Sequence, residues 1–89
     1  MKHVNLKIYG TVQGVGFRYG AHKAAKMAGV TGFVRNEPDS SVYAEAEGEE
    51  EKLKEFIAWC HKGPWFAKVT QVEQEWSDAL QGFTDFEVR

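Results

Sequence analysis

The 89 residues suffice for one domain, residues 1–89, with a single hydrophobic core, and are too few for two. The 43% hydrophobic content supplies that core, and a lone cysteine excludes an internal disulfide and favours a reducing, cytoplasmic setting. Eleven basic and 13 acidic residues give a net charge of −2, which provides no overall attraction for nucleic acid or an anionic membrane, and no apolar run approaches a membrane-spanning length.

The first half of the chain predicts a strand, a helix and a hairpin. Apolar and polar residues alternate from Val4 to Val12, which is the pattern of a half-buried strand and not of a signal peptide or anchor. The stretch from Phe17 to Ala28 is rich in alanine at helical spacings, and Gly29 follows it as a C-terminal cap. Residues 32–36 and 42–47 read as two strands because a segment rich in turn formers separates them.

The second half predicts another helix and two more strands. The stretch from Glu49 to Lys62 has an apolar stripe at helical spacing, and Gly63-Pro64 ends it. Residues 68–76 alternate as a strand does, and residues 86–88 form a possible short C-terminal strand. The predicted order is β-α-β-β-α-β. This is an α+β fold, the ferredoxin-like sandwich, in which two helices cover one face of an antiparallel sheet.

One segment between the first strand and the first helix suggests a binding site: Gln13-Gly14-Val15-Gly16-Phe17-Arg18. Two glycines allow a sharp turn with exposed N–H groups, and the start of a helix adds partial positive charge, so a phosphate-sized anion suits this position. Arg18 adds a permanent charge with a forked set of donors. A tight connection beside an ordinary surface arginine is the alternative, and the glycine pattern alone does not separate the two interpretations.

Asn36 is the second candidate for this site. A right-handed crossover through the first helix makes the first two strands parallel, so both strands end at the same edge of the sheet. With one strand inserted between them, those ends are about 10 Å apart, a gap that Arg18 and Asn36 can close around one ligand. The topology therefore predicts that the glycine segment and Asn36 form a single site.

Two motifs, Gly10-Thr11-Val12-Gln13-Gly14-Val15-Gly16-Phe17-Arg18 and Gly32-Phe33-Val34-Arg35-Asn36, resemble the paired signature of the acylphosphatase family, small enzymes that hydrolyse acyl phosphates. Later segments, including Gly63-Pro64 and residues 86–89, are also similar, so the resemblance covers essentially the whole chain. It implies the sandwich fold and a small-molecule acyl phosphate substrate, with inorganic phosphate or a similar anion as product or inhibitor.

The family resemblance also implies roles for individual residues. Residues 13–18 would bind the phosphate, with Arg18 and the backbone N–H groups of residues 15–17 as donors, and Asn36 would orient the attacking water. Neither a metal nor a cofactor is expected, and a monomer is the default. Ser40 stands where the family commonly has glycine. If that position needs a positive φ, serine there costs about 1 kcal/mol of strain.

Other chemically capable residues receive structural interpretations. Cys60 lies on the apolar stripe of the second helix and is expected to be a buried, inert thiol. The acidic run from Glu47 to Glu51 is interpreted as charge at the helix N-terminus, not as a cation site. The three histidines are expected at the solvated surface and the three tryptophans in packed positions: His3, His22, His61, Trp59, Trp65 and Trp76.

Two other function classes remain open from sequence. RNA-binding modules share this element order and stack bases on sheet aromatics, for which Tyr9 and Tyr43 are candidates. Against that reading, Glu45 and Glu47 share a strand face with Tyr43, and the chain has no basic footprint. The other alternative is a noncatalytic module with the acylphosphatase fold, since a fold does not by itself establish turnover.

Overall fold

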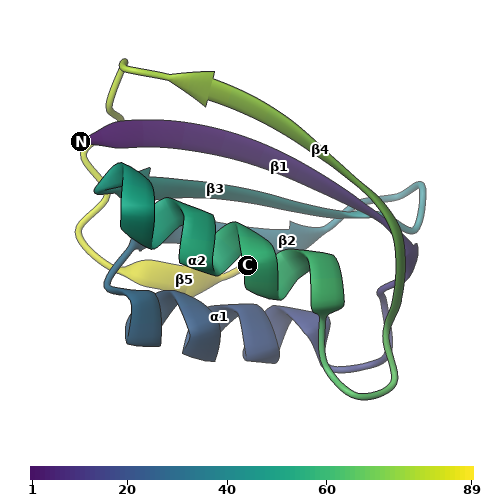
Figure 1. Ribbon diagram of the computed structural model, residues 1–89. Helices are drawn as coiled ribbons and strands as arrows, with labels where there is room; N and C mark the ends of the chain where they lie inside the picture. The colour runs from purple at the N-terminus through teal and green to yellow at the C-terminus, as the bar shows by residue number, and fades with distance from the viewer.

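Two helices pack on one face of a five-stranded sheet in the computed structural model, which describes residues 1–89 (Figure 1). The order of elements is that predicted from the sequence, including the short final strand. The elements are β1 (Lys2–Thr11), α1 (Phe17–Ala28), β2 (Thr31–Asn36), β3 (Val42–Gly48), α2 (Glu50–Lys62), β4 (Lys68–Ser77) and β5 (Phe86–Val88). The predicted ferredoxin-like sandwich is confirmed.

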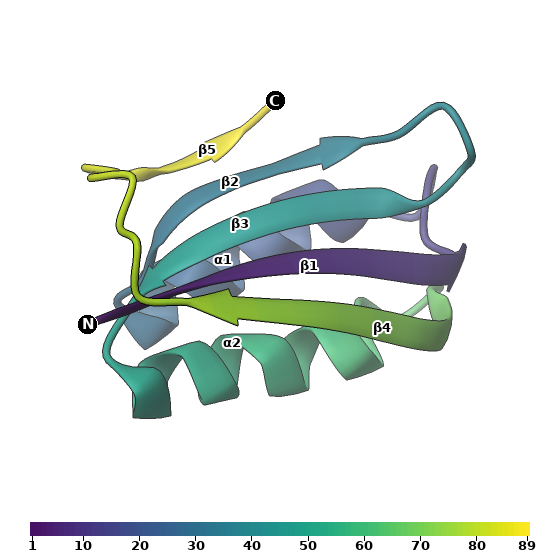
Figure 2. The same ribbon diagram turned by 90° about the horizontal axis from the view of Figure 1, so that it is seen from above.

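The strands lie in the order β4-β1-β3-β2-β5, as the view from above shows (Figure 2). Neighbouring strands are antiparallel except for β2 and β5, which pair in parallel and make the sheet mixed. Because β3 runs antiparallel to both β1 and β2, these two strands point the same way and end at the same edge of the sheet (Figure 1). This is the arrangement on which the predicted site depends.

The core fills the space between the sheet and the helices. Alternate residues of β1, namely Val4, Leu6 and Ile8, are fully buried on the helix-facing side. The predicted stripe of α2 is buried against them, including Cys60, and burial raises the pKa of the Cys60 thiol above its ordinary value. The expectation of a buried thiol is confirmed.

Neither helix has the combination of length and apolar character that a membrane crossing requires.

His3 and Glu47 lie on the face of the sheet opposite the helices. The connection from β4 to β5 passes over one end of the sheet (Figure 2) and contacts both residues. Glu47 accepts hydrogen bonds from the backbone N–H groups of residues 81–83, and the ring of His3 stacks on Phe83 with centroids 6.1 Å apart. His3 Nδ1 and Glu47 Oε2 are 2.7 Å apart, and both side chains are buried. The predictions of a solvated His3 and of a Glu47 that serves the helix dipole are therefore wrong. Strand alternation gave the correct face but could not show that a loop covers it.

This buried pair predicts a pH dependence of stability. Burial alone lowers the pKa of His3, but hydrogen bonds to Glu47 and Asn5 and the charges of Glu45 and Glu47 outweigh it and raise that pKa above 6.5. The folded protein thus holds the His3 proton more tightly than the unfolded chain does. The resulting stabilisation is complete below pH 6.5 and is lost as the pH rises through the raised pKa.

His3→Gln removes this titration, so the stability advantage of the native chain over the variant should shrink as the pH is raised. Urea denaturation of both proteins at a series of pH values, from well below to well above 6.5, measures the difference. A difference that stays constant over that range would show that folding does not change the pKa of His3.

Ser40 has a φ of 76°, as expected if the position suits glycine. The Asp39 carboxylate accepts the N–H of Ser41 and its hydroxyl, which together with Lys7 lowers the pKa of Asp39 to about 2. These local bonds close the turn around Ser40 and hold it in the left-handed region. Ser40→Gly is expected to raise the free energy of unfolding by up to about 1 kcal/mol, measured by urea denaturation. Ser40→Ala keeps the steric penalty and should show no gain; equal stabilities of the two variants would contradict the strain argument.

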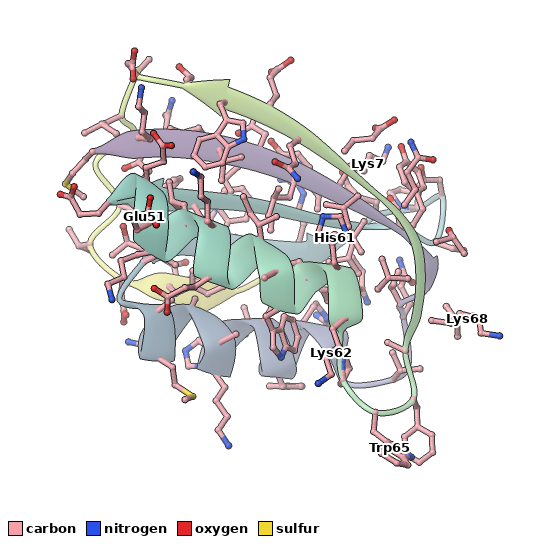
Figure 3. All side chains as sticks on the ribbon, in the orientation of Figure 1. Lys7, Glu51, His61, Lys62, Trp65 and Lys68 are labelled. Carbon is pink, nitrogen blue, oxygen red and sulfur yellow. The ribbon has the colours of Figure 1, made fainter.

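The tryptophans differ in their packing. Trp59 packs on Phe17 with ring centroids 5.2 Å apart, as expected. Trp76 is 37% exposed, so it is not packed as predicted. Trp65 is 91% exposed, and the prediction of packing is wrong there too. The N–H of Ala67 bonds to the Pro64 carbonyl, which closes a turn that directs the intervening side chains outward, and Trp65 extends away from the body of the protein (Figure 3).

Candidate active site

The loop from β1 to α1 has the backbone geometry expected of an anion site. Gly14 and Gly16 have φ values of 75° and 80°, in the left-handed region. A Cβ added at either glycine would meet no atom within 4 Å, so conformation and not space calls for glycine. Gly16 caps α1, no side chain caps the helix N-terminus, and its first turn contains no acidic residue. The positive end of the helix therefore faces the loop without a competing anionic side chain.

A pocket of about 200 Å³ opens at this loop. Arg18 at the start of α1 and Asn36 at the end of β2 both line it, so the structure brings together the two residues that the sequence predicted to meet. The complete lining is Val12, Gly14, Gly16, Phe17, Arg18, Tyr19 and Asn36. It contains no carboxylate, imidazole or thiol. Its polar groups are thus the guanidinium of Arg18, the amide of Asn36, the hydroxyl of Tyr19 and backbone.

A hydrogen bond to a main-chain oxygen orients the side chain of Arg18. Its Nη1 donates to the main-chain oxygen of Arg89 at 3.0 Å, and no carboxylate side chain forms an ion pair with it. That oxygen is held in turn, because the Arg89 N–H bonds to the Val34 carbonyl at 2.8 Å and extends the pairing of β5 with β2. One nitrogen of the guanidinium is therefore fixed on the protein, and the remaining donors are free for an anion.

Asn36 carries the one buried side-chain oxygen of the protein without a hydrogen-bond partner, its Oδ1. Buried polar atoms are rarely left unpaired, because the loss of hydration costs about 1 to 3 kcal/mol. Asn36 lines the same pocket as Arg18, so its Oδ1 is an acceptor at this site that no group of the protein uses. A water molecule has the required donor.

Gln13 has a different position from the one its place in the glycine motif suggested. Its Nε2 donates to the carbonyls of Glu37 and Ser41, each at 2.8 Å, and so ties the loop to the hairpin that follows Asn36. The side chain of Gln13 faces the hairpin, and neither Gln13 nor Val15 lines the pocket. Phosphate binding by their backbone stays a prediction. Sequence reasoning missed this clamp and also missed Tyr19, whose only signal was its place beside Arg18 in the first helical turn.

A larger hollow of about 630 Å³ lies between α2 and β4. Charges of both signs line it, among them Lys2, Glu50, Lys54 and Asp78, and Lys2 and Asp78 pair with each other at 2.8 Å. The start of α2 also borders it, but the carboxylates of Glu50 and Glu51 in that first turn disfavour an anion, and none of its residues has an unpaired buried polar atom. The smaller pocket at the glycine loop is therefore the better candidate for chemistry.

The chain is similar along nearly its whole length to proteins of one known family. A family model described as acylphosphatase matches residues 4–88. An acylphosphatase of Thermococcus kodakarensis is 48% identical over 87 residues, which cover 93% of this chain and 96% of the relative. One from Salinibacter ruber is also 48% identical, over 99% of this chain and 93% of its own.

A solved structure adds a comparison in three dimensions. The crystal structure of acylphosphatase from Bacillus subtilis superposes with a TM-score of 0.98 at 35% sequence identity, over 100% of this chain and 99% of the other. The family model and the identity of full-length relatives extend over nearly all of the chain, including the pocket. The protein therefore belongs to the acylphosphatase family.

Proposed function

We propose that the protein hydrolyses the carboxyl-phosphate bond of acyl phosphates without a metal, using Arg18 and the loop of residues 13–18 to bind the phosphate and Asn36 to orient water. The observation that carries this proposal is the small pocket that Arg18, the start of α1 and Asn36 line together: no side chain caps the helix, and the buried Oδ1 of Asn36 has no partner in the protein. Each of the three meets one need of the reaction.

The phosphoryl group needs positive charge and donors. The N–H groups of residues 15–17 and the fork of Arg18 would surround its oxygens and spread the charge that develops in the transition state. The leaving group is a carboxylate whose conjugate acid has a pKa of about 4 to 5, like that of Asp or Glu side chains, so it departs without a general acid. Positioning and electrostatics supply the catalysis.

The nucleophile is a water molecule that donates one hydrogen bond to Asn36 Oδ1. Its lone pair attacks phosphorus in line with the bond to the acyl oxygen, that bond breaks, and its electron pair leaves on the carboxylate. The water proton passes to a phosphate oxygen of the substrate. The products are a free carboxylate and inorganic phosphate, and atoms and charge balance without a protein base.

The lining of the pocket supports a reaction that needs no metal. Divalent cations in catalytic sites bind to carboxylates, imidazoles or thiolates, and none of these lines the pocket. The protein would instead supply through Arg18 and the start of α1 the positive charge that a metal provides in other phosphoryl-transfer enzymes.

The direct test is hydrolysis of benzoyl phosphate by the native protein in the presence of a chelator, with inorganic phosphate as a competing ligand. Turnover that is unaffected by the chelator and inhibited competitively by phosphate is the expected result. A folded protein that binds phosphate but does not turn over the substrate would instead be a noncatalytic member of the family. Loss of activity on chelation would overturn metal independence.

No observation favours the RNA-binding alternative. The hydroxyls of Tyr43 and Tyr9 are engaged with Glu45 and Glu73, at 2.6 and 3.1 Å. Phe33, the other aromatic residue of that face, is buried beneath its neighbours. A cytoplasmic location and a monomeric state remain expectations, and size-exclusion chromatography measures the second.

A further inference from the structure

We propose that Tyr19 binds the acyl group of the substrate and gives the enzyme a preference for aromatic or extended apolar acyl groups over acetyl. The proposal rests on the function proposed above, in which the phosphate end of the substrate occupies the pocket. It concerns the part of the substrate that extends out of that pocket.

The direction of the acyl group follows from in-line displacement. The attacking water and the leaving oxygen must lie on opposite sides of phosphorus. Asn36, which would hold the water, lies at the end of β2 in the sheet layer, whereas Arg18 and Tyr19 lie in the first turn of α1 in the helix layer (Figure 1). With the water on the sheet side, the acyl group leaves along the wall that α1 forms.

Three side chains of α1 line the pocket, and one is free to meet an apolar group. Phe17 is 2% exposed and packs against Trp59 in the core. Arg18 is held by Arg89 and has its remaining donors for the phosphate. Tyr19 is 71% exposed, its hydroxyl makes no hydrogen bond within the protein, and its ring pairs with no other aromatic ring. Of the α1 side chains that line the pocket, Tyr19 is therefore the one that exposes an aromatic ring to solvent.

The chemistry of the ring sets the class of acyl group. A tyrosine ring presents a large, stiff apolar face at low entropic cost, which suits another ring or a methylene chain better than a single methyl group. Apart from Arg18 the lining carries no charge, so it offers no recognition for an acyl group with a second carboxylate. The expected substrates are therefore neutral apolar acyl phosphates.

The test compares benzoyl phosphate with acetyl phosphate for the native protein, Tyr19→Ala and Tyr19→Phe. Tyr19→Ala is expected to lower the ratio of kcat/KM for benzoyl over acetyl phosphate by roughly 10-fold, mostly through KM. Tyr19→Phe keeps the ring and should keep the ratio. Competitive inhibition by inorganic phosphate, which has no acyl group, reports whether the phosphate site itself has been disturbed.

The possible outcomes are distinct. An equal loss on both substrates, or a weaker inhibition by phosphate in step with the loss, would assign Tyr19 to the support of the loop and overturn the acyl contact. A ratio that does not change in Tyr19→Ala would overturn it as well. If the native protein hydrolysed neither substrate, the proposed function itself would fail, and the acyl contact with it.

Discussion

Arg18→Lys is expected to lower kcat/KM for an acyl phosphate by about 100-fold to 1,000-fold, nearly as much as Arg18→Ala, because each removes a well-aimed donor from the charge that develops in the transition state. The structure explains why a second cation does not substitute. Arg18 uses one nitrogen on the oxygen of Arg89 and has a planar fork left for the phosphate. A lysine ammonium at this position cannot donate to the main-chain oxygen of Arg89 and also form two parallel hydrogen bonds with the phosphate.

The matched control is Arg35→Lys, because Arg35 is an arginine of the opposite sheet face that lies over the ring of Tyr43 and does not line the pocket. It should retain activity. Steady-state kinetics on the three variants, with circular dichroism to confirm folding, decides the matter. Near-normal turnover by Arg18→Lys would show that charge alone suffices and that the bidentate fork has no special part.

Much of this site could be predicted from the sequence, because it depends on patterns within single elements and on the connection between neighbouring ones. Alternation predicted β1 and its buried face, and the turn formers after Asn36 marked the end of β2. The crossover through the first helix then predicted that both strands end at one edge, where Arg18 and Asn36 meet. The positive φ of Gly14 and Gly16 is a property of the residue type. The strain at Ser40 was expected from the family resemblance, because related chains commonly have glycine at that position, and its φ of 76° agrees.

The remaining features depend on contacts between distant segments, which periodicity does not encode. Glu47 has the alternation of a solvent-facing strand residue, and it is buried because three backbone N–H groups of a loop some 35 residues away bond to it. That loop has little apolar periodicity of its own, so nothing in the sequence marked where it crosses the sheet. The bond from Gln13 to the hairpin is also a long-range contact, and there the motif drew attention to the backbone of Gln13 and away from its side chain.

Asn36→Ala is expected to lower kcat by about 100-fold or more with a much smaller change in phosphate inhibition, because the proposed role of Asn36 is to hold the water and not the phosphate. This substitution should not disturb the folded structure. Asn36 Oδ1 accepts no hydrogen bond from the protein, so its removal breaks no native contact of that atom and relieves a buried unpaired acceptor. The variant should therefore be at least as stable as the native chain while it is nearly inactive.

The two pocket variants should differ in how they respond to inorganic phosphate. Arg18→Ala should weaken phosphate inhibition together with turnover, whereas Asn36→Ala should lose turnover and keep the inhibition. Asn5→Ala is the control for the loss of an asparagine side chain, since Asn5 bonds to His3 and does not line the pocket. If Asn36→Ala lost phosphate inhibition as completely as Arg18→Ala does, Asn36 would belong to the anion site, and the water would have to be oriented by some other group of the pocket.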